Sequence, residues 1–174
     1  IVLILIGWAL FFHFLPVSEL VDRIGIQNTY VAAFLLATIG GFSSFTGTSL
    51  YAALIALSHG GVSPLALGVI GGMGLFVSDS IFYLVMVNVR TLIARSTTSW
   101  DRLFRRLWKW VYGTPAWMVY LALFVYIAVV PLPNDVLLAV LALSSYSYRQ
   151  FVWILFIGDV TVALLLTYIG QSFS

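Results

Sequence analysis

The chain has 174 residues, of which 62% are hydrophobic and only 8% are charged, and its formal net charge is +2. A soluble domain carries about a quarter of its residues as charged side chains, so most of this protein's surface does not face water. The net charge is too small, and the chain too apolar, to suggest nucleic-acid binding, and the lack of cysteine excludes disulfides, thiolate metal sites and cysteine nucleophiles. The long apolar runs predict an all-α integral membrane protein.

The apolar runs divide the chain into four parts in sequence order. Residues 1–29 predict an N-terminal helix whose start lies before Ile1, followed by a polar loop. Residues 30–90 form the first repeat: an apolar segment at 30–58 that is interrupted at 40–49, a turn, and a helix that begins at Ser63-Pro64. Residues 91–113 carry most of the charge. Residues 114–174 form the second repeat, with an interruption at 131–135 and a last span at 151–169.

The two interrupted segments correspond to one another, because Thr46 to Leu50 aligns by eye with Pro133 to Leu137. Interrupted helices at matching places in two halves are typical of transporters with a binding site near the membrane midplane. The stretch between the halves has one acidic residue, Asp101, and five basic residues: Arg95, Arg102, Arg105, Arg106 and Lys109. By the positive-inside rule, this excess of basic residues predicts that the stretch lies in the cytoplasm.

That orientation favours one of two topologies for the interrupted segments. If each is a re-entrant hairpin, the first opens outside and the second inside, and Arg149 lies in the cytoplasm. If both span the membrane fully, Arg149 lies outside. We therefore predict an inverted repeat of a re-entrant helical hairpin plus a transmembrane helix, with an interfacial amphipathic helix between the halves.

The chain resembles the DedA family, also called the VTT or SNARE-associated Golgi protein family, over about Tyr30 to Gly170. Gly74 to Tyr83 matches the family pattern Gly-x-x-x-Gly-Asp-x-x-x-Tyr except for Ser78, and the second half has Pro131 in its break and Ile157-Gly158 in its last helix. The resemblance implies a multi-pass protein of a prokaryotic cytoplasmic membrane that moves lipids or polyprenyl-phosphate carriers as a flippase or scramblase, often with the proton gradient.

The sequence departs from the family at three positions that matter for this function. Thr48 stands where the family has an acidic residue in the first break, and Ala128 and Asn134 stand where it has arginines. If those arginines hold a phosphate, their absence argues against a phosphate-bearing substrate. A small-solute or ion exporter on the same scaffold, or a non-transporting membrane scaffold, therefore stays open beside lipid transport.

Three carboxylates fall within the apolar segments: Asp79, Asp135 and Asp159. A charged side chain at the bilayer centre costs on the order of 3 kcal/mol, so it faces the bundle interior or a cavity. We expect these residues to bind a proton or cation during transport; the alternatives are a polar tie between helices or a cap on a broken half-helix.

The two breaks offer half-helix N-termini, whose N–H groups and dipole attract an anionic headgroup. The candidate substrate-binding residues are Thr46, Gly47, Thr48 and Ser49 in the first break and Pro131, Pro133 and Asn134 in the second. A structural kink satisfied by the hydroxyl groups is the alternative. The glycines from Gly68 to Gly74 predict close helix packing.

The stretch from Ser99 to Val111 places apolar residues on one helical face, which is typical of an interfacial helix. Its cations predict contact with anionic lipid headgroups: Arg102, Arg105, Arg106 and Lys109. No metal-ligand spacing and no catalytic Ser/His/Asp arrangement is present, so we expect neither a metal, nor a cofactor, nor enzymatic activity. The sequence leaves the oligomeric state open, a homo-oligomer included.

Overall fold

The computed structural model describes residues 22–23, 25–41, 44–93, 109, 113–129, 134–144 and 146–172, without the side chains of residues 44–46, 48, 59 and 91–93. The described residues form six α-helices and contain no strand, which confirms the all-α prediction. The helices are α3 (Ile26–Gly40), α4 (Ser44–His59), α5 (Pro64–Ile93), α7 (Ala116–Val129), α8 (Asn134–Leu143) and α9 (Tyr148–Gln171).

Local chemistry sets where these helices begin. Helix α5 begins at Pro64, as the sequence predicts. The carbonyl and the hydroxyl of Ser63 stabilise this start, because they accept hydrogen bonds from the amides of Leu67 (2.9 Å) and Ala66 (3.4 Å). Helix α3 begins at Ile26, four residues before the predicted start of the first repeat. Both the amide and the hydroxyl of Thr29 bond to the carbonyl of Gly25, at 3.0 and 3.1 Å, and this stabilises the extra turn.

The interruptions are shorter than the sequence predicts. Helix α3 ends at Gly40 and α4 begins at Ser44, so Thr46 to Ser49 are helical and do not belong to a loop. In the second half, Asn134 and Asp135 are likewise the first residues of α8. Unpaired backbone amides and carbonyls have no water to bond with in an apolar environment, so a helix with internal hydrogen bonds is favoured over a long loop.

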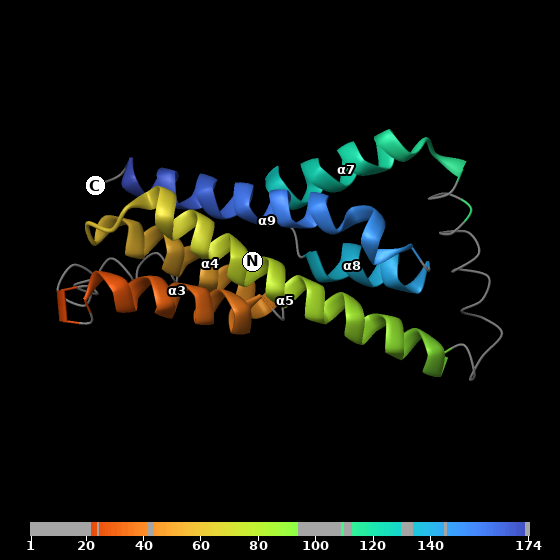
Figure 1. Cartoon of the computed structure of the whole chain (residues 1–174), viewed down its shortest axis with the longest axis horizontal. Coiled ribbons are helices and arrows are strands. Elements are labelled where there is room, and N and C mark those ends of the chain that lie inside the picture. Colours follow the sequence, from red (N-terminus) through yellow and green to blue (C-terminus); the bar gives the residue numbers. More distant parts are fainter. Residues whose placement is uncertain are drawn as a thin grey trace.

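The two longest helices, α5 and α9, run antiparallel and contact one another closely (Figure 1). Glycines make this approach possible. A Cβ on Gly72 would lie 2.5 Å from the Cα of Val160, and one on Gly68 would lie 2.9 Å from the Cα of Leu164. The glycines of α5 therefore serve helix packing, as the sequence predicts.

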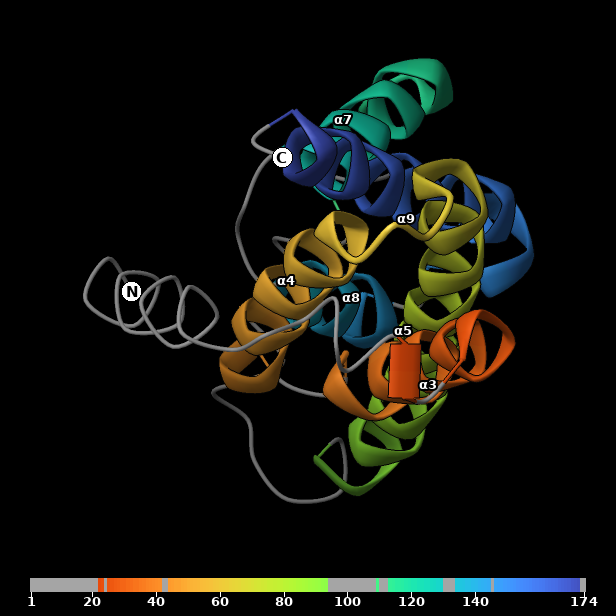
Figure 2. The same ribbon diagram turned by 90° about the vertical axis from the view of Figure 1, so that its left-hand side faces the viewer.

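The four shorter helices form two pairs that each fold back on themselves. Helices α3 and α4 run in opposite directions, and so do α7 and α8 (Figure 1). The first member of each pair packs on the long helix of its own half, α3 on α5 and α7 on α9. Figure 2 shows these two contacts at opposite edges of the bundle. The second member packs mainly on the long helix of the other half, α4 on α9 and α8 on α5.

The described residues bury two separate apolar cores. One core joins mostly first-half residues, such as Leu54, Leu67 and Leu75, with Ala163 of α9. The other joins mostly second-half residues, such as Leu138 and Phe151, with Tyr83 of α5. The exchange of α4 and α8 between the halves is what lets each core include a residue of the opposite half.

The outer faces of the helices remain apolar. Large side chains on four helices are 62–72% exposed: Ile39, Trp117, Val129, Val136 and Trp153. Exposed apolar faces of this kind mark contact with a membrane or another protein. Among the described residues, α5 over Pro64–Arg90 and α9 over Tyr148–Gln171 are long and apolar enough to cross a membrane, judged by length and composition.

Candidate functional site: a carboxyl pair between the two halves

Asp79 and Asp159 lie where the two apolar cores meet. On α5, Leu75 of the first core and Tyr83 of the second stand four residues before and after Asp79. On α9, Leu155 of the second core and Ala163 of the first flank Asp159 in the same way. Residues four apart share one face of a helix, so each carboxyl group occupies the buried face at the junction of the cores.

The residue before each aspartate is packed against an interruption. A Cβ on Gly41, at the end of α3, would lie 2.8 Å from the Cβ of Ser78. A Cβ on Gly158 would lie 2.6 Å from Ile127, in the last turn of α7. Small residues at three of these four positions, Gly41, Ser78 and Gly158, let the ends of α3 and α7 pack at the level of the two carboxyl groups.

The two carboxyl groups are both buried but have different surroundings. Asp79 is 2% exposed, and its Oδ2 accepts a hydrogen bond of 3.0 Å from the Nδ2 of Asn134 at the start of α8. Asp159 is fully buried at 0% exposure, and neither of its oxygens receives a hydrogen bond from any described donor. The side chains of Asp79 and Asp159 lie within electrostatic range of one another.

This arrangement requires a proton or a cation to be fully satisfied. An ionised carboxylate only accepts hydrogen bonds, so two facing carboxylates cannot bond to each other unless one of them holds a proton. Two like charges held close together in a buried site repel strongly. A proton or a cation placed between Asp79 and Asp159 removes that repulsion, and this is the chemistry for which the pair is suited.

Asp135 and Tyr51 add to the polar surroundings of the pair. Asp135 is half-buried next to Asn134 and lies within electrostatic range of Asp79. The half-buried Tyr51, on α4, lies within electrostatic range of all three carboxyl groups, in the order Asp79, Asp159 and Asp135. The site therefore draws on α4, α5, α8 and α9.

The structure brings only some of the predicted site residues together. Asp79, Asp135, Asp159 and Asn134 come together from three helices. Gly47 and Ser49 are half-buried in the first two turns of α4, where Thr46 and Thr48 are also placed by their backbone alone. Pro131 and Pro133 lie outside the described residues. Tyr51 was not predicted; its one sequence signal is its position four residues after Gly47, on the same helical face.

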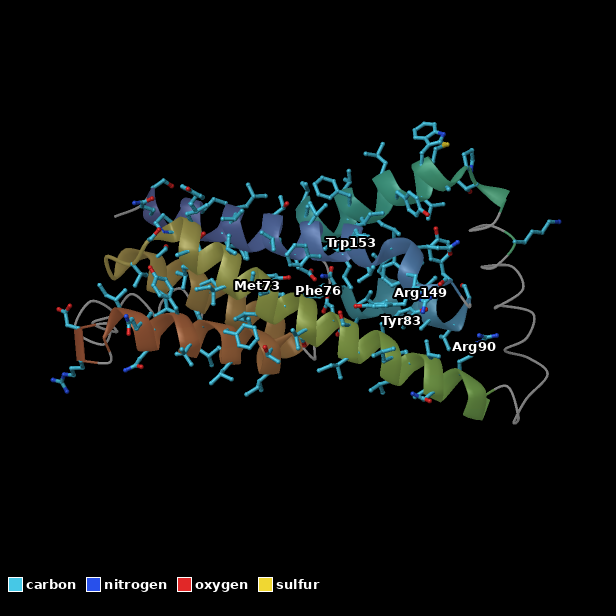
Figure 3. The ribbon with its side chains drawn as sticks, in the orientation of Figure 1. Met73, Phe76, Tyr83, Arg90, Arg149 and Trp153 are labelled. Atoms are coloured by element: carbon cyan, nitrogen blue, oxygen red, sulfur yellow. The ribbon has the colours of Figure 1, made fainter. Side chains whose placement is uncertain are left out.

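The predicted membrane-surface residues lie mostly outside the described part of the chain. Arg102, Arg105 and Arg106 are among the residues that the structure does not describe, and so is most of the predicted amphipathic helix. Lys109 is described and exposed. Figure 3 shows Arg90 and Arg149 near the same end of the bundle, where α5 ends and α9 begins.

No match to this chain was found among protein-family models, curated proteins or solved structures.

Proposed function

We propose that the chain is a multi-pass membrane transporter built from two inverted halves. Three features of the fold support this proposal: the paired helices α3–α4 and α7–α8 each fold back, α5 and α9 run antiparallel, and α4 and α8 are exchanged between the halves. In this arrangement the two pairs are re-entrant hairpins that enter the bilayer from opposite sides. The end of α3 at Gly41, the last turn of α7 and the start of α8 at Asn134 lie at the level of Asp79 and Asp159.

The orientation of the protein follows from its cations. Arg90 and Arg149 lie near one end of the bundle, and Lys109 belongs to the basic segment that connects α5 to α7 (Figure 3). By the positive-inside rule, this end faces the cytoplasm. The hairpin α3–α4 then opens to the outside and α7–α8 opens to the cytoplasm.

The observation that carries the transport proposal is the buried carboxyl pair. From residue 24 onward, the chain has few charged residues outside the basic segment at 91–113. Apart from Arg90, which borders that segment, they are Asp79, Asp135, Arg149 and Asp159. Three of the four are acids that gather at one level between the halves. Charges inside a membrane protein mark ion or substrate pathways, so the pair is the site at which a proton or cation couples to movement of the halves.

The substrate follows from the resemblance to the DedA family: a lipid or lipid-linked carrier moved across the bilayer. Apolar outer faces on α3, α7 and α9 suit a substrate that approaches through the membrane. A small-solute or ion exporter is the second candidate, and the acidic character of the site favours it. No arginine or lysine lies on α3, α4, α7 or α8 to hold a phosphate.

Reconstitution into liposomes separates these functions. Fluorescent phospholipid in one leaflet reports lipid movement, and an enclosed pH dye reports proton movement. We expect lipid movement that is lost in Asp159→Asn and retained in Asp22→Asn, a matched change at an exposed aspartate outside the bundle core. Solute or proton movement without lipid movement would support the exporter, and a folded protein that moves neither would support a scaffold and refute both transport proposals.

Single cysteines test the topology in a protein that has none of its own. Ser63 lies in the exposed turn before α5, and Ser147 lies in the exposed turn before α9. In right-side-out vesicles, a membrane-impermeant maleimide should label Ser63→Cys from outside and Ser147→Cys only after permeabilisation. Labelling of both from one side would refute the inverted hairpins.

A further inference from the structure

The three acids between the halves differ in how far the protein encloses them. Asp159 is 0% exposed and Asp79 is 2% exposed, whereas Asp135, in the first turn of α8, is only half-buried. A carboxyl group at membrane depth faces the bundle interior or a water-filled cavity and not lipid, so in a membrane the exposed part of Asp135 adjoins water. The acids therefore form a series that begins at a group in contact with water and ends at a fully enclosed one.

Asp79 is the middle member of this series. It lies within electrostatic range of both Asp159 and Asp135. Its Oδ2 accepts the 3.0 Å hydrogen bond from the side chain of Asn134, the residue that precedes Asp135 in α8. Because Oδ2 already accepts this bond, Oδ1 is the oxygen of Asp79 that is better placed to take a proton.

The surroundings of Asp159 indicate which ion it can hold. Protein atoms enclose both of its carboxyl oxygens, and neither oxygen receives a hydrogen bond from a described donor. A metal ion needs several oxygen ligands, and the described residues contain no cluster of three or more His, Cys, Asp or Glu side chains that could supply them. An ionised carboxyl group that is buried without a donor is strongly destabilised. A proton removes that charge and needs no additional space.

The other titratable groups around these acids are tyrosines and distant arginines. Tyr51 of α4 lies within electrostatic range of all three acids, and Tyr126 of α7 lies within range of Asp135. A tyrosine hydroxyl stays protonated and uncharged at neutral pH. Arg90 on α5 and Arg149 on α9 each stand about three helical turns from the aspartate on the same helix. The described residues therefore place no basic side chain beside the acids to neutralise them.

We propose that Asp135, Asp79 and Asp159 form a proton relay in that order, in which Asp135 exchanges protons with water and Asp159 holds the proton in the enclosed site. The relay rests on the proposed function, because it supplies the ion that couples to transport. An ionised Asp135 takes a proton from water and passes it to Asp79, and Asp79 passes it to Asp159. Asp135 and Asp79 are ionised again afterwards, so the net change is one proton taken from water and one neutral Asp159. Each transfer follows a hydrogen bond, direct or through one water molecule.

Infrared spectroscopy of the purified protein tests the end of the relay without transport. A protonated carboxyl group has a carbonyl stretching band that an ionised carboxylate lacks, and a detergent without carbonyl groups keeps this region of the spectrum clear. At neutral pH we expect the band in the wild type and its loss in Asp159→Asn. Asp79→Asn and Asp135→Asn should keep the band. Asp22→Asn, at an exposed aspartate, is the matched control and should also keep it.

Transfer of the protein into deuterium oxide tests the order of the relay, because the band shifts when deuterium replaces the proton of Asp159. Loss of a positioned proton-transfer group slows transfer on the order of a hundredfold, and we expect this slowing in both Asp135→Asn and Asp79→Asn. Asp135→Glu should restore the wild-type rate, and Asp22→Asn should not change it. If Asp135 had only a structural role, its loss would leave the exchange rate unchanged or raise it by loosening the fold.

Four results would overturn the proposal: no protonated carboxyl band in the wild type, a band that persists in Asp159→Asn, wild-type exchange in Asp135→Asn, or a band that weakens when sodium chloride replaces choline chloride. Size-exclusion chromatography identifies misfolded variants. If Asp159→Asn does not fold, Asp159→Glu, which keeps the carboxyl group, should shift the band, and an unshifted band would refute the assignment.

Failure of the relay and failure of the proposed function give different results. A protein with the expected band and exchange rates that moves neither lipid nor solute in liposomes would refute the proposed function and leave the proton relay standing. Transport by a wild-type protein that lacks the band would refute the relay and leave the proposed function standing.

Discussion

The hydrogen bond from Asn134 to Asp79 ties α8 to the carboxyl pair, and its strength can be measured. Asn134→Ala removes the donor from a carboxyl group that is 2% exposed. A hydrogen bond to a charged group contributes about 1.5–3 kcal/mol, and burial leaves no water to replace it. We expect the variant to lose about that much free energy of unfolding.

A double-mutant cycle isolates this contribution from the loss of packing. Asn134→Ala, Asp79→Ala and the double variant are unfolded by adding sodium dodecyl sulfate to detergent micelles, with tryptophan fluorescence as the signal. The coupling energy should reach about 1.5–3 kcal/mol. Asn88→Ala, on the exposed face of α5, should cost about 0.5 kcal/mol or less. Effects of the two site variants that add to within about 0.5 kcal/mol would refute the reasoning.

Two further changes use the same unfolding assay. Gly72→Ala places a methyl group 2.5 Å from the Cα of Val160, so α5 and α9 must separate, and we expect a loss of about 1–3 kcal/mol in the free energy of unfolding. Gly113→Ala, in open surroundings, is the control. Equal stability of the two variants would contradict close packing of α5 and α9. Tyr83→Phe removes the hydroxyl that donates to the Tyr146 carbonyl and should cost about 1–2 kcal/mol; wild-type stability would show that this bond is not needed.

The helical architecture was predictable because it depends on signals that are local in sequence. Apolar runs without charge predict helices, and Ser63-Pro64 predicts the start of α5 to the residue. The predicted breaks were too long because hydroxyl and glycine residues from Thr46 to Ser49 were taken as helix-breaking. In an apolar setting, the cost of unpaired backbone groups exceeds the weak helix propensity of such residues.

The partners within the site could not be predicted, because they depend on how distant segments pack. The sequence singles out Asp79 and Asp159 as isolated charges in apolar helices. It does not indicate that Asn134 bonds to one of them, 55 residues away, while the other lacks a described donor. Tyr51 was missed for the same reason, since a tyrosine in an apolar helix carries no sign of what it faces.

The exchange of helices between the halves links the site to any motion of the protein. Asn134 belongs to the second half and Asp79 to the first, so their hydrogen bond crosses the boundary between the halves. Separation of the halves at this level must therefore break the bond and the contact between the two carboxyl groups. A proton or cation that neutralises the pair changes the free energy of the state in which the halves are in contact, relative to the state in which they are apart. A ligand shifts a conformational equilibrium by such a difference in free energy. In the proposed transporter, coupling between ion binding and movement follows from placing one carboxyl group on each half.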